Sequence, residues 1–219
     1  ITTERFVNAL LIFDFLTIYK IMKGRYNVFL RTFFLKFGIV ASIFAATNGY
    51  GQAINNNWKQ DLSGSLQEFV NCENPDPNSV SPCTKFIGNS LNSVYKVNDF
   101  YSQELGRYLM VHEIAAFLEK SGKWTLLGRG YEQKALSEAQ SLANTKKAVV
   151  AVYLNAENIG HVALILPGEL KPSGSWGFNV PNSASFFLND PQNSYVDKGL
   201  SYAFGRDLLR HVLIYAKNY

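Results

Sequence analysis

One cysteine stands where nucleophilic chemistry is possible. Cys83 directly follows Pro82 and precedes an apolar pattern of helical period that extends to Tyr95. Proline fits the first turn of a helix, where its missing N–H costs nothing, so Cys83 is expected at a helix N-terminus. That position lowers the pKa of a thiol from its usual value of about 8.5 and favours the reactive thiolate. The sequence therefore makes Cys83 a candidate nucleophile, with its own backbone N–H expected to point toward the developing oxyanion.

One histidine is placed to serve as its base. His161 directly follows Gly160 and opens an apolar β run. A cysteine nucleophile needs a base within hydrogen-bond reach, and glycine beside the histidine permits a close backbone approach. His112 has Ala116 four residues later instead of the second histidine of a zinc-binding helix, and His211 is typical of a surface or packing residue. His161 is therefore the candidate base, and no metal site is predicted.

A second cysteine offers a competing interpretation of Cys83. Cys72 lies close enough along the chain for the loop between the two to close as a disulfide. Such a bond is stable in an oxidising compartment and would remove the nucleophile. The two cysteines alone leave the catalytic and the structural interpretation open. The presence of His161 favours the catalytic one.

The elements that would position these residues form a helical half followed by a strand-rich half. Within the helical half, residues 124–131 are expected to be a turn-rich connection between the last two helices. The apolar spacing predicts helices over residues 58–71, 84–95, 100–120 and 133–143, and strands over 148–154, 161–166, 176–180, 183–188 and 212–215. This order predicts an α+β fold in which N-terminal helices pack on an antiparallel β-sheet.

Residues 1–53 are expected to be a leader rather than part of the fold. Positive residues follow Met22, an apolar stretch covers residues 38–46, and small side chains precede a cleavage point after Ala53. This is the pattern of a secretory signal peptide starting at about Met22, and a retained membrane anchor is the alternative. Either way the domain formed by residues 54–219 is expected to work outside the cytoplasm, in the periplasm or the extracellular envelope.

Composition limits the remaining classes. The chain has 219 residues, of which 47% are hydrophobic, enough for one globular domain with a core. Its net charge of +4 belongs to the leader, because residues 1–52 hold six basic and two acidic side chains and the rest holds 15 of each. The mature domain has no dense basic cluster, so a nucleic-acid partner is not expected.

The surroundings of Cys83 and His161 resemble those of the NlpC-like and CHAP-like cell-wall peptidases. The resemblance rests on CTKFIG from Cys83 at a helix start and on GHVALILPG from Gly160 on a strand, within about residues 58–188. It implies a papain-like fold and hydrolysis of peptide or amide bonds in peptidoglycan. The chain departs from the commonest pattern at Pro82, where aspartate is usual, and at Thr84, where serine is usual.

The resemblance also implies a third residue on the strand after the histidine strand, which holds the imidazole in one orientation and tautomer. Asn182 is predicted for this role, because it leads into the extended run that follows it. Asn179, Ser183 and Ser185 are the other candidates. The implied mechanism is attack by Cys83, proton transfer by His161 and hydrolysis of a thioester.

The expected function is therefore a secreted cysteine hydrolase that acts on peptidoglycan stem peptides. The mechanism needs no metal and no organic cofactor, and contact with a membrane is expected only through an uncleaved leader. The alternative is a non-enzymatic secreted binding module of the same fold, in which Cys72 and Cys83 form a disulfide.

Overall fold

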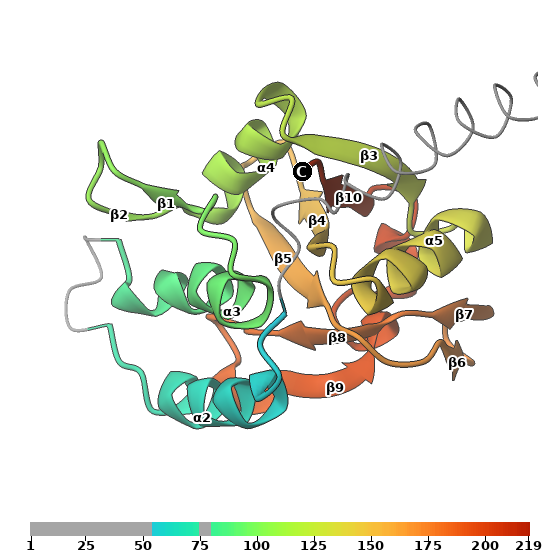
Figure 1. Cartoon of the computed structure of the whole chain (residues 1–219), viewed down its shortest axis with the longest axis horizontal. Helices are drawn as coiled ribbons and strands as arrows, with labels where there is room; N and C mark the ends of the chain where they lie inside the picture. The colour runs from blue at the N-terminus through green and yellow to red at the C-terminus, as the bar shows by residue number, and fades with distance from the viewer. Residues whose placement is uncertain (1–53, 75–79) are drawn as a thin grey trace, which may run out of the picture. The chain divides into compact units, whose positions relative to one another are not determined.

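A six-stranded antiparallel sheet organises the part of the chain that the computed structural model describes, residues 54–74 and 80–219. The described residues belong to one compact unit, and the predicted leader lies outside them. The strand order is β3–β10–β4–β5–β8–β9, with every neighbouring pair antiparallel (Figure 1). The strands span Trp124–Arg129 (β3), Val149–Leu154 (β4), Gly160–Ile165 (β5), Asn182–Ser185 (β8), Tyr195–Gly199 (β9) and Leu213–Lys217 (β10).

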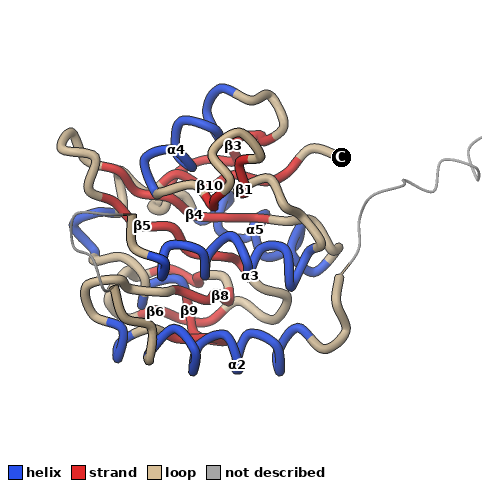
Figure 2. Tube along the Cα trace, turned by 90° about the vertical axis from the view of Figure 1, so that its left-hand side faces the viewer, coloured by secondary structure: helices blue, strands red, loops and turns tan. Residues whose placement is uncertain are grey.

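Helices cover both faces of this sheet. On one face lie α2 (Trp58–Val70), α3 (Lys85–Tyr95) and α4 (Val111–Lys120), and α2 runs alongside α3 (Figures 1 and 2). On the other face lie α5 (Gln133–Asn144) and the short 3-10 turns η3 (Leu200–Tyr202) and η4 (Arg206–Leu208). Because both faces are covered, the central strands are apolar at nearly every position.

Alternation along β5 shows how the strand serves two cores. Val162 and Leu164 pack with the α2, α3 and α4 side, whereas Ala163 and Ile165 pack with the α5 side. Successive side chains of a strand point to opposite faces, so each odd or even set joins one core. The prediction of an α+β fold with helices packed on an antiparallel sheet is confirmed.

The prediction of one helix over residues 100–120 is wrong. Its first half is a hairpin of β1 (Tyr101–Ser102) and β2 (Arg107–Tyr108), and only α4 is helical. Gly106 takes φ +62°, and the N–H of Leu105 donates to Ser102 Oγ, so the chain reverses before α4 begins. The helical spacing of apolar residues over this stretch was therefore partly fortuitous.

The prediction of a turn-rich connection over residues 124–131 is also wrong, because β3 forms an edge of the sheet there. Gly128, with φ +150°, sits at an irregularity of the β3–β10 register, and most of the strand faces solvent on one side. A second short hairpin, which joins β6 (Lys171–Ser173) to β7 (Phe178–Val180), lies beside the main sheet (Figure 1). Strand β9, which the sequence did not predict, forms the other edge.

Candidate functional site

Cys83 lies at a helix N-terminus, as predicted. It belongs to the 3-10 turn η1 (Pro82–Thr84), which leads directly into α3. Ser81 caps this turn, and its Oγ accepts a hydrogen bond from the N–H of Cys83 at 3.2 Å. That N–H, predicted to point at an oxyanion, is therefore engaged by Ser81 in this structure.

The thiol of Cys83 is not free. Cys83 and Cys72 form a disulfide, and the described residues contain no free cysteine. The side chain of Cys83 is only 7% exposed and packs in a cluster with Phe69, Phe86 and Phe186. Of the two interpretations open from the sequence, the structure thus holds the disulfide state, in which Cys83 is no nucleophile.

His161 is the second residue of β5 and lies next to a tight backbone contact. A Cβ atom added at Gly160 would overlap the carbonyl oxygen of Tyr153 on β4, so glycine is needed for the strands to meet here. The half-buried imidazole stacks on Phe187, with ring centroids 4.5 Å apart and planes 6° from parallel. The edge of Phe204 completes its aromatic surroundings at 5.6 Å.

Ser185 on β8 is the hydrogen-bond partner of this imidazole. Its Oγ lies 2.5 Å from His161 Nε2, and the residue is fully buried. Among the described residues, the other ring nitrogen, Nδ1, has no hydrogen-bond partner. Burial lowers the pKa of His161 to about 4, so the imidazole is neutral at pH 7.

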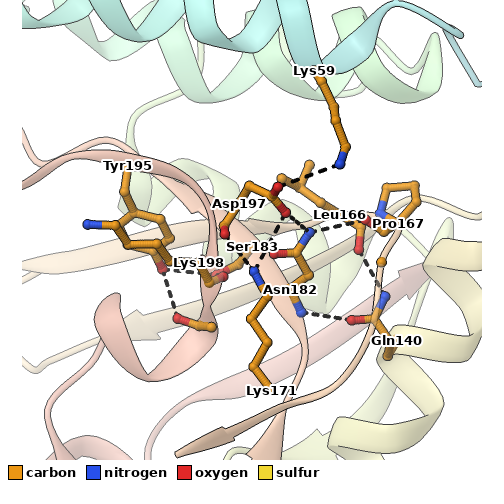
Figure 3. A network of polar contacts seen from close by, with 12 residues as sticks. Lys59, Gln140, Leu166, Pro167, Lys171, Asn182, Ser183, Tyr195, Asp197 and Lys198 are labelled. Carbon is orange, nitrogen blue, oxygen red and sulfur yellow. Dashed lines mark hydrogen bonds and ion pairs between the residues drawn. The ribbon is translucent and has the colours of Figure 1, made fainter.

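Asn182, the predicted orienting residue, lies in a separate polar network. Its Nδ2 donates to the carbonyl of Pro167 at 3.1 Å and to Asp197 Oδ1 at 2.7 Å (Figure 3). Its backbone N–H donates to Oε1 of Gln140 from α5 at 2.7 Å. None of these partners is His161, so the structure does not bring Asn182 to the candidate base.

The register of β5 and β8 explains this separation. Ser185 pairs with Ala163, and the carbonyl of Asn182 accepts from the N–H of Leu166. Leu166 follows His161 by five residues, which at about 3.3 Å per residue is about 16 Å along the strand. Ser185 lies instead diagonally across from His161 and on the same face of the sheet.

The remaining two candidates for the third residue also lie elsewhere. Ser183 Oγ contacts the hydroxyl of Tyr195 at 2.9 Å and donates to the carbonyl of Lys198. Asn179 lies on β7, where its backbone exchanges hydrogen bonds with the side chain of Gln133. Of the four residues considered from the sequence, only Ser185 contacts the imidazole.

Cys83 and His161 border one cleft of about 460 Å³. Cys83 borders the cleft on the α3 side of the sheet. His161 lies on the opposite face of β5, together with Ala163 and Ile165, so the cleft extends around the start of this strand. No hydrogen bond joins Cys83 to His161 in the described residues. The lining is mainly apolar, contains no lysine or arginine, and is formed by residues 83–84, 87, 109–112, 158–162, 186–190, 203–204 and 208.

His112 is a cleft residue that sequence reasoning set aside. It lies in the first turn of α4 and lines the same cleft. The sequence suggested only a zinc-binding helix for His112, and that pattern is incomplete, so nothing in it pointed to the cleft. Glu113 holds the start of α4, which carries His112, in place. Its carboxylate accepts a hydrogen bond from the N–H of Met110 and forms an ion pair with Arg107 at 2.7 Å. The hydrogen bond from Arg107 is the main cause that lowers the pKa of Glu113 to about 2.

The described residues contain no group of three histidine, cysteine, aspartate or glutamate side chains arranged to hold a metal ion. Over the same ranges, no helix combines the length and the apolar character needed to cross a membrane. No protein-family model matches the chain, and comparison with curated proteins found no match. The site must therefore be interpreted from its own geometry.

Proposed function

We propose that this protein is a cysteine hydrolase of papain-like fold whose active form has a reduced Cys83. One observation carries the proposal. The cleft that Cys83 borders from a helix start is also bordered by His161, whose Nε2 contacts the buried hydroxyl of Ser185. Nucleophile, base and orienting residue thereby come from a helix start and two paired strands of a single site.

Ser185 supports the proposal through the tautomer that it selects. If Nε2–H donates to Ser185 Oγ, the lone pair of His161 lies on Nδ1, which has no partner among the described residues. Ser185 itself is fully buried and does not line the cleft, so it acts as a positioning residue and not as a second nucleophile. This is the division of labour of a Cys–His–third-residue site.

The reaction would proceed by acyl transfer. Once the disulfide is open, the side chain of Cys83 is free to rotate toward the cleft, and the helix start favours its thiolate. The thiolate attacks an amide carbonyl, and His161 takes the thiol proton and passes it to the leaving amine. Water then hydrolyses the thioester with His161 as base. The face of Phe187 stabilises the transient imidazolium.

For the substrate, we propose amide bonds of bacterial peptidoglycan stem peptides. The proposal is supported by the resemblance of the Cys83 and His161 segments to cell-wall peptidases and by the apolar lining, which suits alanine methyl groups. An exported protein is compatible with the disulfide, because such bonds persist in oxidising compartments. No step requires a metal, an organic cofactor or a nucleic acid.

The disulfide favours a second candidate, a secreted binding module of the same architecture. In this alternative the Cys72–Cys83 bond is permanent and the cleft only binds its ligand. A structural disulfide in a small exported domain contributes about 2–4 kcal/mol to stability, so this role needs no catalysis to explain both cysteines.

Digestion of purified sacculi by the full chain separates the two candidates. We expect wild type with dithiothreitol, and Cys72→Ser without it, to release fragments whose masses identify the cleaved bond. Cys83→Ala should release none under either condition, and circular dichroism should establish that each variant is folded. Equal release by Cys83→Ala would exclude Cys83 as the nucleophile, and no release by folded Cys72→Ser or by reduced wild type would favour the binding module.

A further inference from the structure

We propose that Cys72 is a thiol–disulfide exchange site, at which an external dithiol attacks and from which Cys83 departs as a thiolate. Activation of the nucleophile by this exchange rests on the proposed function, whereas the direction of the exchange does not. The inference comes from three differences between the two ends of one disulfide.

The first difference is that the two sulfurs lie at opposite helix ends. Cys72 follows the C-terminus of α2, where its N–H donates to the carbonyl of Phe69. Cys83 lies in the turn that opens α3. A helix carries about half a positive charge at its N-terminus and half a negative charge at its C-terminus. The thiolate of Cys83 is therefore stabilised and that of Cys72 is disfavoured.

The second difference is accessibility. Cys72 is half-buried and is flanked by the exposed residues Asn71, Glu73 and Asn74. Cys83 is buried in the cluster of Phe69, Phe86 and Phe186 described above. Cys72 also packs against this cluster but is the more exposed of the two cysteines, so its end of the disulfide is the easier one for a reductant to approach.

The third difference is the destination of the released group. Cys83 borders the cleft with His161, whereas Cys72 is not among the described residues that line it. The sulfur that leaves is thus the one that already borders the cleft of the candidate base, and the attacking reductant does not have to enter that cleft. Exchange at Cys72 leaves the cleft open.

The chemistry balances with a dithiol as the reductant. One of its thiolates bonds to the sulfur of Cys72, the disulfide breaks, and its electron pair leaves with Cys83. The second thiol then attacks the mixed disulfide, which releases Cys72 and oxidises the reductant to its own disulfide. The protein gains two electrons and two protons, one at Cys72 and one shared by Cys83 and His161. Leaving groups of low pKa depart faster, which favours attack at Cys72.

Mapping of a mixed disulfide tests the direction of exchange without any substrate. The oxidised, native full chain is treated with glutathione as the probe, trapped with N-ethylmaleimide, digested and analysed by mass spectrometry. We expect glutathione on Cys72 and maleimide on Cys83, in at least tenfold excess over the reverse pattern. Unfolding in urea should bring the two patterns close to equality, because the helix ends are lost.

Two results would overturn the proposal. Glutathione found mainly on Cys83, or shared equally in the native protein, would exclude the asymmetry. A native disulfide that exchanges only after unfolding would make it a structural bond. Because the mapping requires no hydrolysis, failure of the proposed function in sacculus digestion is distinguished from failure of the exchange site.

Discussion

The two ends of strand β8 place similar polar residues in different kinds of surroundings. Asn182 begins the strand within a network that joins three elements through Gln140, the carbonyl of Pro167 and Asp197. Ser185 ends the strand with one partner, the imidazole of His161 at the cleft. The first residue holds segments of the fold together, and the second holds one side chain that borders a cavity. The role of a buried polar residue therefore depends on its partner. Partners within the fold give it a structural role, whereas a partner that borders a cleft makes it a candidate for the site.

Among substitutions on strand β8, removal of the Ser185 hydroxyl should have the largest effect on activity. We expect Ser185→Ala to lower kcat about 100-fold, because a base displaced by a fraction of an ångström loses much of its effect. The acid limb of the pH–rate profile should move to lower pH, because the imidazolium loses the hydroxyl that accepts from Nε2–H. Rates with reduced enzyme on sacculi measure both.

Ser183→Ala provides the matched control, since Ser183 is an equally buried serine of the same strand that contacts Tyr195 instead of His161. Its kcat should stay within about threefold of wild type. A similar loss in both variants would mean that Ser185 acts only through stability.

The Asn182→Ala substitution should reverse the pattern. It removes two side-chain hydrogen bonds at a residue that is 1% exposed, so we expect a loss of about 2 kcal/mol in the free energy of unfolding. The kcat of the folded fraction should be unchanged. Urea unfolding gives the stability, with Asn179→Ala as control, because the side chain of Asn179 is exposed and should contribute less than about 0.5 kcal/mol. A fall in kcat without a fall in the free energy of unfolding would mean that Asn182 acts in catalysis and not only in stability.

The buried imidazole predicts that stability depends on pH between pH 6.5 and 4. The pKa of His161 is about 4 in the folded protein and 6.5 when unperturbed, so the unfolded state binds more protons in this window. Acidification should therefore destabilise the oxidised protein, by about 2 to 3 kcal/mol across the window, with little contribution above pH 6.5. Glu113, whose pKa falls from 4.5 to about 2 on folding, loses its stabilising contribution as the pH falls from 4.5 toward 2.

Unfolding midpoints measured against pH should show a flatter profile in His161→Gln and an unchanged one in His211→Gln, where the histidine is exposed. A wild-type profile that is already flat between pH 4 and 6.5 would mean that the imidazole is not held neutral in the folded state.

Local signals predicted half of the candidate site. Pro82 before an amphipathic pattern placed Cys83 at a helix start, and Gly160 before an apolar run placed His161 at a strand start. Both features depend on neighbours in the chain. The partner of His161 depends on the pairing of β5 with β8. The β6–β7 hairpin separates these two strands in the chain, so the register of their pairing cannot be read from neighbouring residues. The available signal was the composition of β8, in which Ser183 and Ser185 alternate with Ala184 in a fully buried strand.

The failures at the fold level have the same origin. The β1–β2 hairpin depends on the turn at Gly106 and Ser102, which the helical spacing of apolar residues from 100 to 120 concealed. Strand β3 is an edge strand with a register irregularity, so it lacks the continuous apolar run of β4. The pairing of Cys72 with Cys83 stayed open because loop length permits the bond and does not require it.

The proposed function requires Cys83 and His161 to act as nucleophile and base in one cleft. The most direct test is the pH dependence of Cys83 alkylation by iodoacetamide in the Cys72→Ser protein, compared with the same protein carrying His161→Gln or His211→Gln. We predict a midpoint well below the ordinary thiol value of about 8.5, which moves toward that value with His161→Gln and does not move with His211→Gln. A midpoint near 8.5 in all three proteins would contradict the account, because Cys83 would then be an ordinary thiol without a base.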